Sequence, residues 1–240
     1  MIKTIFFFLI FWLGLLLSLL LLLIYYVLKF AGLKEAEKKF VYVITSNWAK
    51  FTLFTAGIKL MVKGRDHATA VLPGFVVISN HQGNFDVPVF LACLPFSAGF
   101  IAKKELMKMP FLSSWMNALD CLFIDRNNPR KAREKLIQRI VQKEKNPVFL
   151  FPEGTRSRGN LPGPFRTGTL KLLFQNRIEI LPVTINGSYK CYEKYGNVKG
   201  STIGVIFHPV LKTSQYGLSE FERFNSDLQK IIAEPLHQNS

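Results

Sequence analysis

The segment FVVISNHQGNFD, residues 75–86, joins an apolar, β-branched run to a polar loop that contains a histidine and an aspartate. Phe75–Ser79 has the length and composition of a buried strand. In open α/β sheets, reactive groups gather where strands end and loops begin. This segment therefore predicts one strand of such a sheet, with a candidate site at its carboxyl end.

Further short apolar runs follow along the chain, separated by stretches with helical periodicity. These runs are Gly99–Ala102, Cys121–Ile124, Val148–Phe151, Ile180–Ile185 and Thr202–Phe207. One helix is expected after Asn127 and Asn128, with Pro129 near its first turn, and another from about Leu218 to Ile232. The alternation predicts an α/β fold in which helices flank a mixed sheet.

The N-terminal part of the chain differs in composition from the rest. Thr4–Leu28 is a run of 25 residues without a charge, long enough at about 1.5 Å per residue to cross a bilayer core of about 30 Å. A cleaved signal peptide is the alternative, but its apolar core would be about half as long and would end at small residues. Because Tyr25 and Tyr26 lie near the end of this run, we expect a retained membrane anchor. Four lysines follow within residues 29–39, against Lys3 alone before the run, which predicts that the bulk of the chain lies on the cytoplasmic side.

The next segment, Phe40–Val62, carries apolar side chains at helical spacing, interrupted by Lys50 and Lys59. This pattern favours a helix that lies in the membrane interface. An ordinary helix that faces the core of the soluble domain is the alternative. We expect residues 1–63 to form a membrane-docking segment of two helices, and residues 64–240 to form the folded domain.

Composition narrows the class of protein. The chain has 240 residues, of which 49% are hydrophobic, which excludes a disordered chain. The formal net charge of +15 favours an anionic partner, namely nucleic acid, an anionic membrane surface or a phosphorylated substrate. Nucleic acid is disfavoured because no recognised motif accompanies the charge. The three cysteines and four histidines have no ligand spacing, so we expect neither a metal site nor a disulfide framework.

The pair His81 and Asp86 suggests acid–base chemistry. The unperturbed pKa of histidine, about 6.5, suits proton transfer near neutral pH. Asp86 lies five residues on, near a helix start, so its carboxylate can turn back towards the imidazole, fix its tautomer and leave the other nitrogen as a base. A loop histidine beside a helix N-cap is the alternative.

Cationic side chains follow other strands. In FPEGTRSR, residues 151–158, the proline and glycine favour a tight turn that would aim Arg156 and Arg158 outward, where guanidinium groups match phosphate oxygens. Two further predicted strands are followed by cations, which are Lys103 and Lys104 after one strand and Arg126 after the other. Polar surface loops with solvated charges are the alternative for all of them.

Taken together, these segments resemble the 1-acylglycerol-3-phosphate acyltransferases (lysophosphatidate acyltransferases) of the glycerolipid acyltransferase superfamily, over about residues 64–210. The matching blocks are Asn80-His81 with Asp86, Phe123–Arg126, Phe151–Ser157 and Leu181–Val183. Before the second of these blocks, Asp120 stands where the family usually has glycine, and this puts the turn before that strand in doubt.

The resemblance implies that the domain transfers an acyl chain from acyl-CoA or acyl-carrier protein to the sn-2 hydroxyl of 1-acylglycerol-3-phosphate, giving phosphatidic acid. His81 would be the general base, and Asp86 would orient and stabilise its imidazolium. No cofactor is implied beyond the acyl donor, and the partners would be membrane lipids, lysophosphatidate and that donor. The side chains that would hold the acceptor phosphate or shape its site are Lys103, Arg126, Glu153, Gly154, Thr155 and Arg156.

Other functions remain open on the sequence alone. The same chemistry could act on another lysophospholipid, on glycerol-3-phosphate or on an amino-lipid. A cysteine hydrolase is disfavoured because Cys121 lies inside a predicted strand. A non-catalytic membrane-binding module would leave the spacing of His81 and Asp86 unexplained.

Overall fold

A computed structural model describes the chain except for residues 70, 72–73, 126, 142–144 and 238–240. Within the described residues, seven strands form one sheet in the order β1-β7-β6-β2-β5-β3-β4. Neighbouring strands are parallel except for β6 and β7, so the sheet is mixed, as predicted. The strands are β1 (Lys59–Lys63), β2 (Val76–Ser79), β3 (Gly99–Lys103), β4 (Leu122–Ile124), β5 (Val148–Leu150), β6 (Ile180–Asn186) and β7 (Thr202–Phe207).

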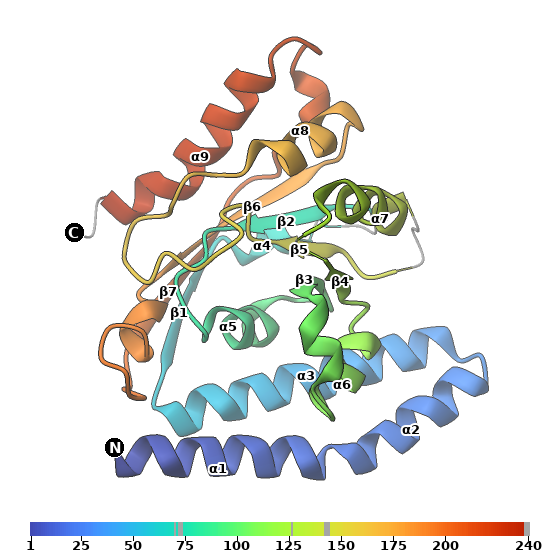
Figure 1. Ribbon diagram of the computed structural model, residues 1–240, viewed down its shortest axis with the longest axis vertical. Coiled ribbons are helices and arrows are strands. Elements are labelled where there is room, and N and C mark those ends of the chain that lie inside the picture. Colours follow the sequence, from blue (N-terminus) through green and yellow to red (C-terminus); the bar gives the residue numbers. More distant parts are fainter. Residues whose placement is uncertain (70, 72–73, 126, 142–144, 238–240) are drawn as a thin grey trace.

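Helices cover both faces of this sheet and bury a core on each. On one face lie α3, α5 and α6, with α1 and α2 outside α3, and on the other face lie α7, α8 and α9 (Figure 1). These helices are α1 (Ile2–Leu17), α2 (Leu19–Phe30), α3 (Lys34–Ala56), α5 (Asp86–Cys93), α6 (Leu112–Ala118), α7 (Pro129–Val141), α8 (Thr167–Gln175) and α9 (Phe221–His237). Shorter segments are the helix α4 (Arg65–Thr69) and the 3-10 turns η1 (Lys104–Lys108), η2 (Ser188–Cys191) and η3 (Thr213–Gln215).

The strand β1 was not predicted, and the predicted helix Phe40–Val62 is wrong at its carboxyl end. Helix α3 stops at Ala56 because Gly57 adopts a left-handed conformation with φ of 75°. The N–H of Ile58 then donates to the carbonyl of Leu53, which satisfies an end group of the helix. The chain leaves this turn as β1, which pairs in parallel with β7 at the edge of the sheet.

Helix α3 is also more deeply packed than an interfacial helix would be. Val41, Ala49 and Ala56 are buried, and α3 packs against α5 on the side that faces the sheet. The alternative expectation, a helix that faces the core of the folded domain, is therefore correct for this side of α3. Phe54, in contrast, is 80% exposed and points away from the core.

The apolar run Thr4–Leu28 forms α1 and α2, which meet at Ser18. Together, Ile2–Phe30 is the one helical stretch in the described part of the chain that is long and apolar enough to cross a membrane. Helix α1 runs alongside α3 at the bottom of the view in Figure 1. Large apolar side chains on its outer side, such as Ile5 and Leu9, are exposed. A protein surface of this kind suits contact with lipid.

The turn before β4 keeps the backbone that glycine would give. Asp120 has a φ of 61°, in the left-handed region that aspartate tolerates better than most residues. Its carboxylate lies 3.0 Å from Lys145 and 3.9 Å from Arg139. The doubt raised by the missing glycine is therefore removed.

Candidate active site

The end of β2 is anchored so that His81 leaves the sheet at a fixed point. The side chain of Asn80 is buried and forms two hydrogen bonds with the backbone of Ile185 in β6, each 2.9 Å long. Gln82 is also buried, and its carbonyl oxygen accepts the N–H of Gly187 at 2.8 Å. These bonds connect the end of β2 and its loop to β6 and the segment after it. Asn80 and Gln82, the residues on either side of His81, are therefore fixed in position.

The carboxylate of Asp86 contacts the imidazole of His81, as predicted from their spacing. Asp86 begins α5, is fully buried, and its Oδ2 lies 2.7 Å from His81 Nδ1. The same oxygen accepts the N–H groups of Gln82 at 2.6 Å and Gly83 at 3.0 Å, and Oδ1 accepts the hydroxyl of Ser188. An ionised carboxylate only accepts hydrogen bonds, so Nδ1 of the neutral imidazole carries the proton. Nε2 is then the basic nitrogen.

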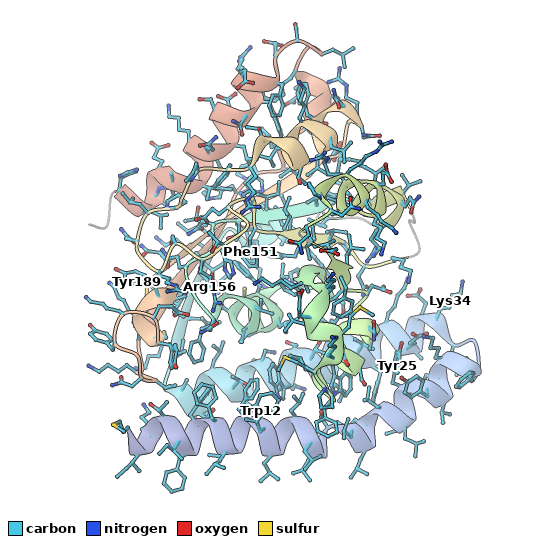
Figure 2. The ribbon with its side chains drawn as sticks, in the orientation of Figure 1. Trp12, Tyr25, Lys34, Phe151, Arg156 and Tyr189 are labelled. Carbon is cyan, nitrogen blue, oxygen red and sulfur yellow. The ribbon has the colours of Figure 1, made fainter. Side chains whose placement is uncertain are left out.

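The imidazole of His81 also has a flat apolar support. It stacks on the ring of Phe151, with centroids 4.0 Å apart and an angle of 17° between the planes. Phe151 and Arg156 lie near one another between α5 and the strand ends in Figure 2. The ring of His81 is therefore fixed by a hydrogen bond at one edge and by stacking on one face.

Glu153 lies behind the site and not in it. Its side chain is buried, Oε1 accepts the backbone N–H of His81 at 2.6 Å, and Oε2 accepts that of Gly163 at 2.7 Å. Burial raises the pKa of this carboxyl above its usual range, and the two backbone hydrogen bonds oppose that shift. Of the two roles expected for Glu153, the geometry matches shaping the site and does not match direct contact with the acceptor phosphate.

Arg156 is held by two groups that the sequence did not single out. Its Nη1 donates to Asn84 Oδ1 and lies 3.8 Å from Glu193 Oε1. The same Glu193 oxygen accepts the N–H of Asn84 at 2.7 Å, and the Glu193 side chain is only 5% exposed. Burial raises the pKa of Glu193. Asn84 lies inside a recognised block, but Glu193 follows η2 in a loop without a motif, and only the fold brings it to the site.

A cavity of about 850 Å³ joins these residues. His81, Lys103, Gly154, Thr155 and Arg156 line it, so the structure brings together these five expected site residues. Arg126, a further cation expected near the rim, lies outside the described residues. On one side the cavity is walled by apolar side chains of α1 and α3, and these are Phe7, Phe8, Phe11, Leu15, Ile44 and Trp48.

Cys121 also lines the cavity, but its chemistry does not suit a nucleophile. Burial raises the pKa of its thiol to about 12, and its sulfur accepts the N–H of Phe100 at 3.4 Å. A thiol with that pKa stays protonated at neutral pH, whereas the thiolate is the reactive form. The burial of Cys121 therefore disfavours a hydrolase that uses this thiol as its nucleophile.

Comparison with known proteins gives a consistent result. A family model described as Acyltransferase matches residues 59–186, beginning at the first residue of β1. The 1-acyl-sn-glycerol-3-phosphate acyltransferase of Borreliella burgdorferi is 28% identical over 191 residues, which cover 78% of this chain and 74% of that protein. The probable 1-acyl-sn-glycerol-3-phosphate acyltransferase of Mycoplasma genitalium is 30% identical over 216 residues, covering 83% and 77%.

A solved structure matches nearly the whole chain. The crystal structure of the 1-acyl-sn-glycerophosphate acyltransferase PlsC from Thermotoga maritima aligns with a TM-score of 0.84, covering 99% of this chain and 94% of that one at 22% identity. The match includes α1 and α2, so the N-terminal helices belong to the shared fold.

Proposed function

The chain belongs to the acyltransferase family, and on this premise we propose that it transfers an acyl chain from a thioester to the sn-2 hydroxyl of 1-acylglycerol-3-phosphate, giving phosphatidic acid. The observation that carries the proposal is the pair His81 and Asp86 at a cavity with an apolar wall and cationic side chains. Such a cavity suits a substrate that has both an acyl chain and a phosphate.

The imidazole of His81 acts as the general base. As the acceptor hydroxyl attacks the thioester carbonyl, Nε2 takes its proton, and the buried carboxylate of Asp86 stabilises the imidazolium that forms. Collapse of the tetrahedral intermediate re-forms the carbonyl and breaks the C–S bond. The thiolate leaves and accepts the proton from His81. The acceptor alcohol is itself the nucleophile, so no acyl-enzyme is required.

Arg156 is the best-placed cation for the acceptor phosphate. Its guanidinium lines the cavity and is oriented by Asn84 and Glu193, and a guanidinium can bind phosphate through two parallel hydrogen bonds. Thr155 and Lys103 line the same cavity and add a hydroxyl and an ammonium. The apolar wall contributed by α1 and α3 favours an acceptor that carries an acyl chain over glycerol-3-phosphate.

The N-terminal helices support a location at a membrane. The exposed apolar side of α1 and the net charge of +15 both favour an anionic lipid surface, to which each nearby basic residue adds about 1 kcal/mol. The lysines after residue 28 favour the cytoplasmic leaflet. We propose that the domain acts on lipids at that surface.

The test is acyl transfer from a labelled acyl-CoA, and separately from an acyl-carrier protein, to lysophosphatidate in detergent micelles. The wild type should form phosphatidic acid with at least one donor, and His81→Ala should not, while circular dichroism shows that the variant is folded. Glycerol-3-phosphate and a lysophospholipid with a headgroup serve as comparison acceptors. Full activity of His81→Ala would exclude the mechanism, and faster transfer to a comparison acceptor would reassign the substrate.

A further inference from the structure

The cavity has a second end, on the opposite face of the sheet from its apolar wall. Helices α7 and α8 lie on that face, away from α1 and α3 (Figure 1). Residues at the start of both helices line this end of the cavity. Arg166 and Gly168 are exposed there, so the second end opens to water. The residues that line it are Pro129, Ala132, Arg133, Leu136, Arg166, Gly168 and Thr169.

Arg133 and Arg166 bring two guanidinium groups to this end. Arg133, half-buried on α7, reaches the start of α8, because a Cβ placed on Gly168 would lie 3.3 Å from its Nη1. Arg166 covers Gly154, and its Nε donates to the carbonyl of Glu153 at 3.2 Å. Both side chains line this end of the cavity, Arg133 from α7 and Arg166 from the residue before α8.

These two cations lack carboxylate partners in the described part of the chain. The one described carboxylate that lines the cavity, Asp125, lies 2.6 Å from Lys104 instead. Partly buried charges are stable when paired or solvated, and a guanidinium is well suited to a phosphate group. An anion bound between Arg133 and Arg166 would pair with the half-buried guanidinium of Arg133 and could also contact the exposed guanidinium of Arg166.

The acceptor phosphate already has a cation in Arg156, which leaves Arg133, and Arg166 beside Gly154, for another anion. Arg156, the cation proposed for the acceptor, takes its partners from the β2–α5 loop and from the segment after η2. Arg133 and Arg166 instead belong to α7 and to the residue before α8, and these helices lie on the opposite face of the sheet from α1 (Figure 1). A lipid would reach the cavity from the exposed apolar side of α1, and a water-soluble acyl donor would reach it from the end at α7 and α8.

We propose that Arg133 and Arg166 bind the phosphate of the phosphopantetheine arm through which the acyl donor presents its thioester. This arm is common to coenzyme A and acyl-carrier protein, so one site serves either donor. The inference rests on the proposed acyl transfer, since it assigns the residues that bind the phosphate of the acyl donor in that reaction.

The first test is a binding measurement that does not need turnover. Calorimetry compares 4′-phosphopantetheine with pantetheine, which lacks the phosphate, on the full-length protein in detergent micelles. The wild type should bind the phosphorylated compound about tenfold more tightly, the effect of one charge-assisted hydrogen bond. This preference should fall in Arg133→Ala, where Arg166 alone is left for the phosphate, and fall less in Arg133→Lys, which keeps the charge but loses the planar fork. A wild type without the preference overturns the proposal.

Arg130→Ala is the matched control for these variants. Arg130 lies on the same helix, its side chain is 88% exposed, and it pairs with Glu134 outside the cavity. It should bind both compounds as the wild type does. Equal losses in Arg130→Ala and Arg133→Ala would mean that general charge, and not a site, attracts the phosphate.

Steady-state kinetics then identify the substrate that the site serves. Arg133→Ala should raise the KM for acyl-CoA and acyl-carrier protein about tenfold, leave the KM for lysophosphatidate unchanged, and have no effect on transfer from acyl-pantetheine. A raised KM for lysophosphatidate would overturn the assignment to the donor, as would a loss confined to acyl-CoA. If the wild type binds phosphopantetheine with the expected preference but transfers nothing to any acceptor, the proposed function fails and the phosphate site stands.

Discussion

Replacing Asp86 by asparagine isolates the charge of the carboxylate from its hydrogen bonds. Oδ2 of Asp86 accepts from His81 Nδ1 and from two backbone N–H groups, while Oδ1 accepts the hydroxyl of Ser188. An asparagine whose carbonyl oxygen takes the place of Oδ2 keeps all three of those bonds. Its amide group then faces Ser188, and a hydroxyl can accept as well as donate. Asp86→Asn should therefore fold and keep the tautomer of His81.

What the variant loses is the attraction between carboxylate and imidazolium. Two unit charges about 4 Å apart interact by about 4 kcal/mol at an effective dielectric constant of 20, a value that describes buried protein sites well. Each 1.36 kcal/mol changes a rate tenfold, so kcat should fall by about 10³. The KM for lysophosphatidate should change little, because the carboxylate of Asp86 is buried behind His81 and does not line the cavity.

The assay is thioester-dependent formation of phosphatidic acid in micelles, with initial rates over a range of both substrates. Ser188→Ala is the matched control, since it removes one hydrogen bond from Asp86 and leaves the charge in place. It should lower kcat by about tenfold at most. Thermal unfolding reports whether each variant is folded. If Asp86→Asn retains kcat within tenfold of the wild type, the imidazolium does not form in the rate-limiting step and the general-base mechanism is wrong.

Three further changes test other parts of the site and fold. Glu193→Gln should raise the KM for lysophosphatidate about fivefold, with a smaller change in kcat, because Arg156 loses an ion pair of about 1 kcal/mol while Asn84 keeps its acceptor; an unchanged KM in initial-rate measurements would contradict this role. Cys121→Ala should keep its kcat in the same assay, since a thiol with a pKa of about 12 takes no part in catalysis, and an inactive but folded variant would contradict this. Burial lowers the pKa of His208 to about 4, so below pH 6.5 the unfolded chain binds a proton at this side chain that the folded chain does not bind. The free energy of unfolding should therefore decrease as the pH falls from about 6.5 to 4. Urea midpoints measured at stepped pH report this decrease, which should be smaller in His208→Gln.

The buried strands were predictable because their composition reflects burial on both faces. Val76–Ser79 and most of Ile180–Asn186 are buried, and such strands appear in sequence as continuous apolar runs. Lys59–Lys63 is different, because it is a mostly exposed edge strand in which lysines flank apolar residues. Its partner β7 lies far away in the chain, so no local pattern distinguishes it from the end of the preceding helix.

The site was predictable to the extent that its groups lie close together in sequence. His81 and Asp86 belong to one loop, and their spacing alone allows the contact that the structure shows. Ser188 and Glu193 complete the same site from the segment after β6, where neither has a neighbour that suggests chemistry. For Glu153 the sequence suggested the wrong partner. Its residue type and block suggested contact with substrate, but its buried carboxylate accepts the backbone N–H of His81 instead.

The first helix is part of the active-site cavity as well as a candidate for membrane attachment. Phe7 of α1 contacts the ring of Phe85, the residue before Asp86, with centroids 5.6 Å apart. Polar contacts fasten the helix to the domain, since Thr4 Oγ1 accepts the N–H of Val198 at 3.0 Å and Ser18 Oγ accepts Trp115 Nε1 at 2.8 Å. A helix that only tethered the domain to lipid would need none of these contacts. The division at residues 63 and 64 stays a prediction about domains, but the walls of the cavity come from both sides of it. Under the proposed function, the acyl chain and the membrane would therefore contact the same helix.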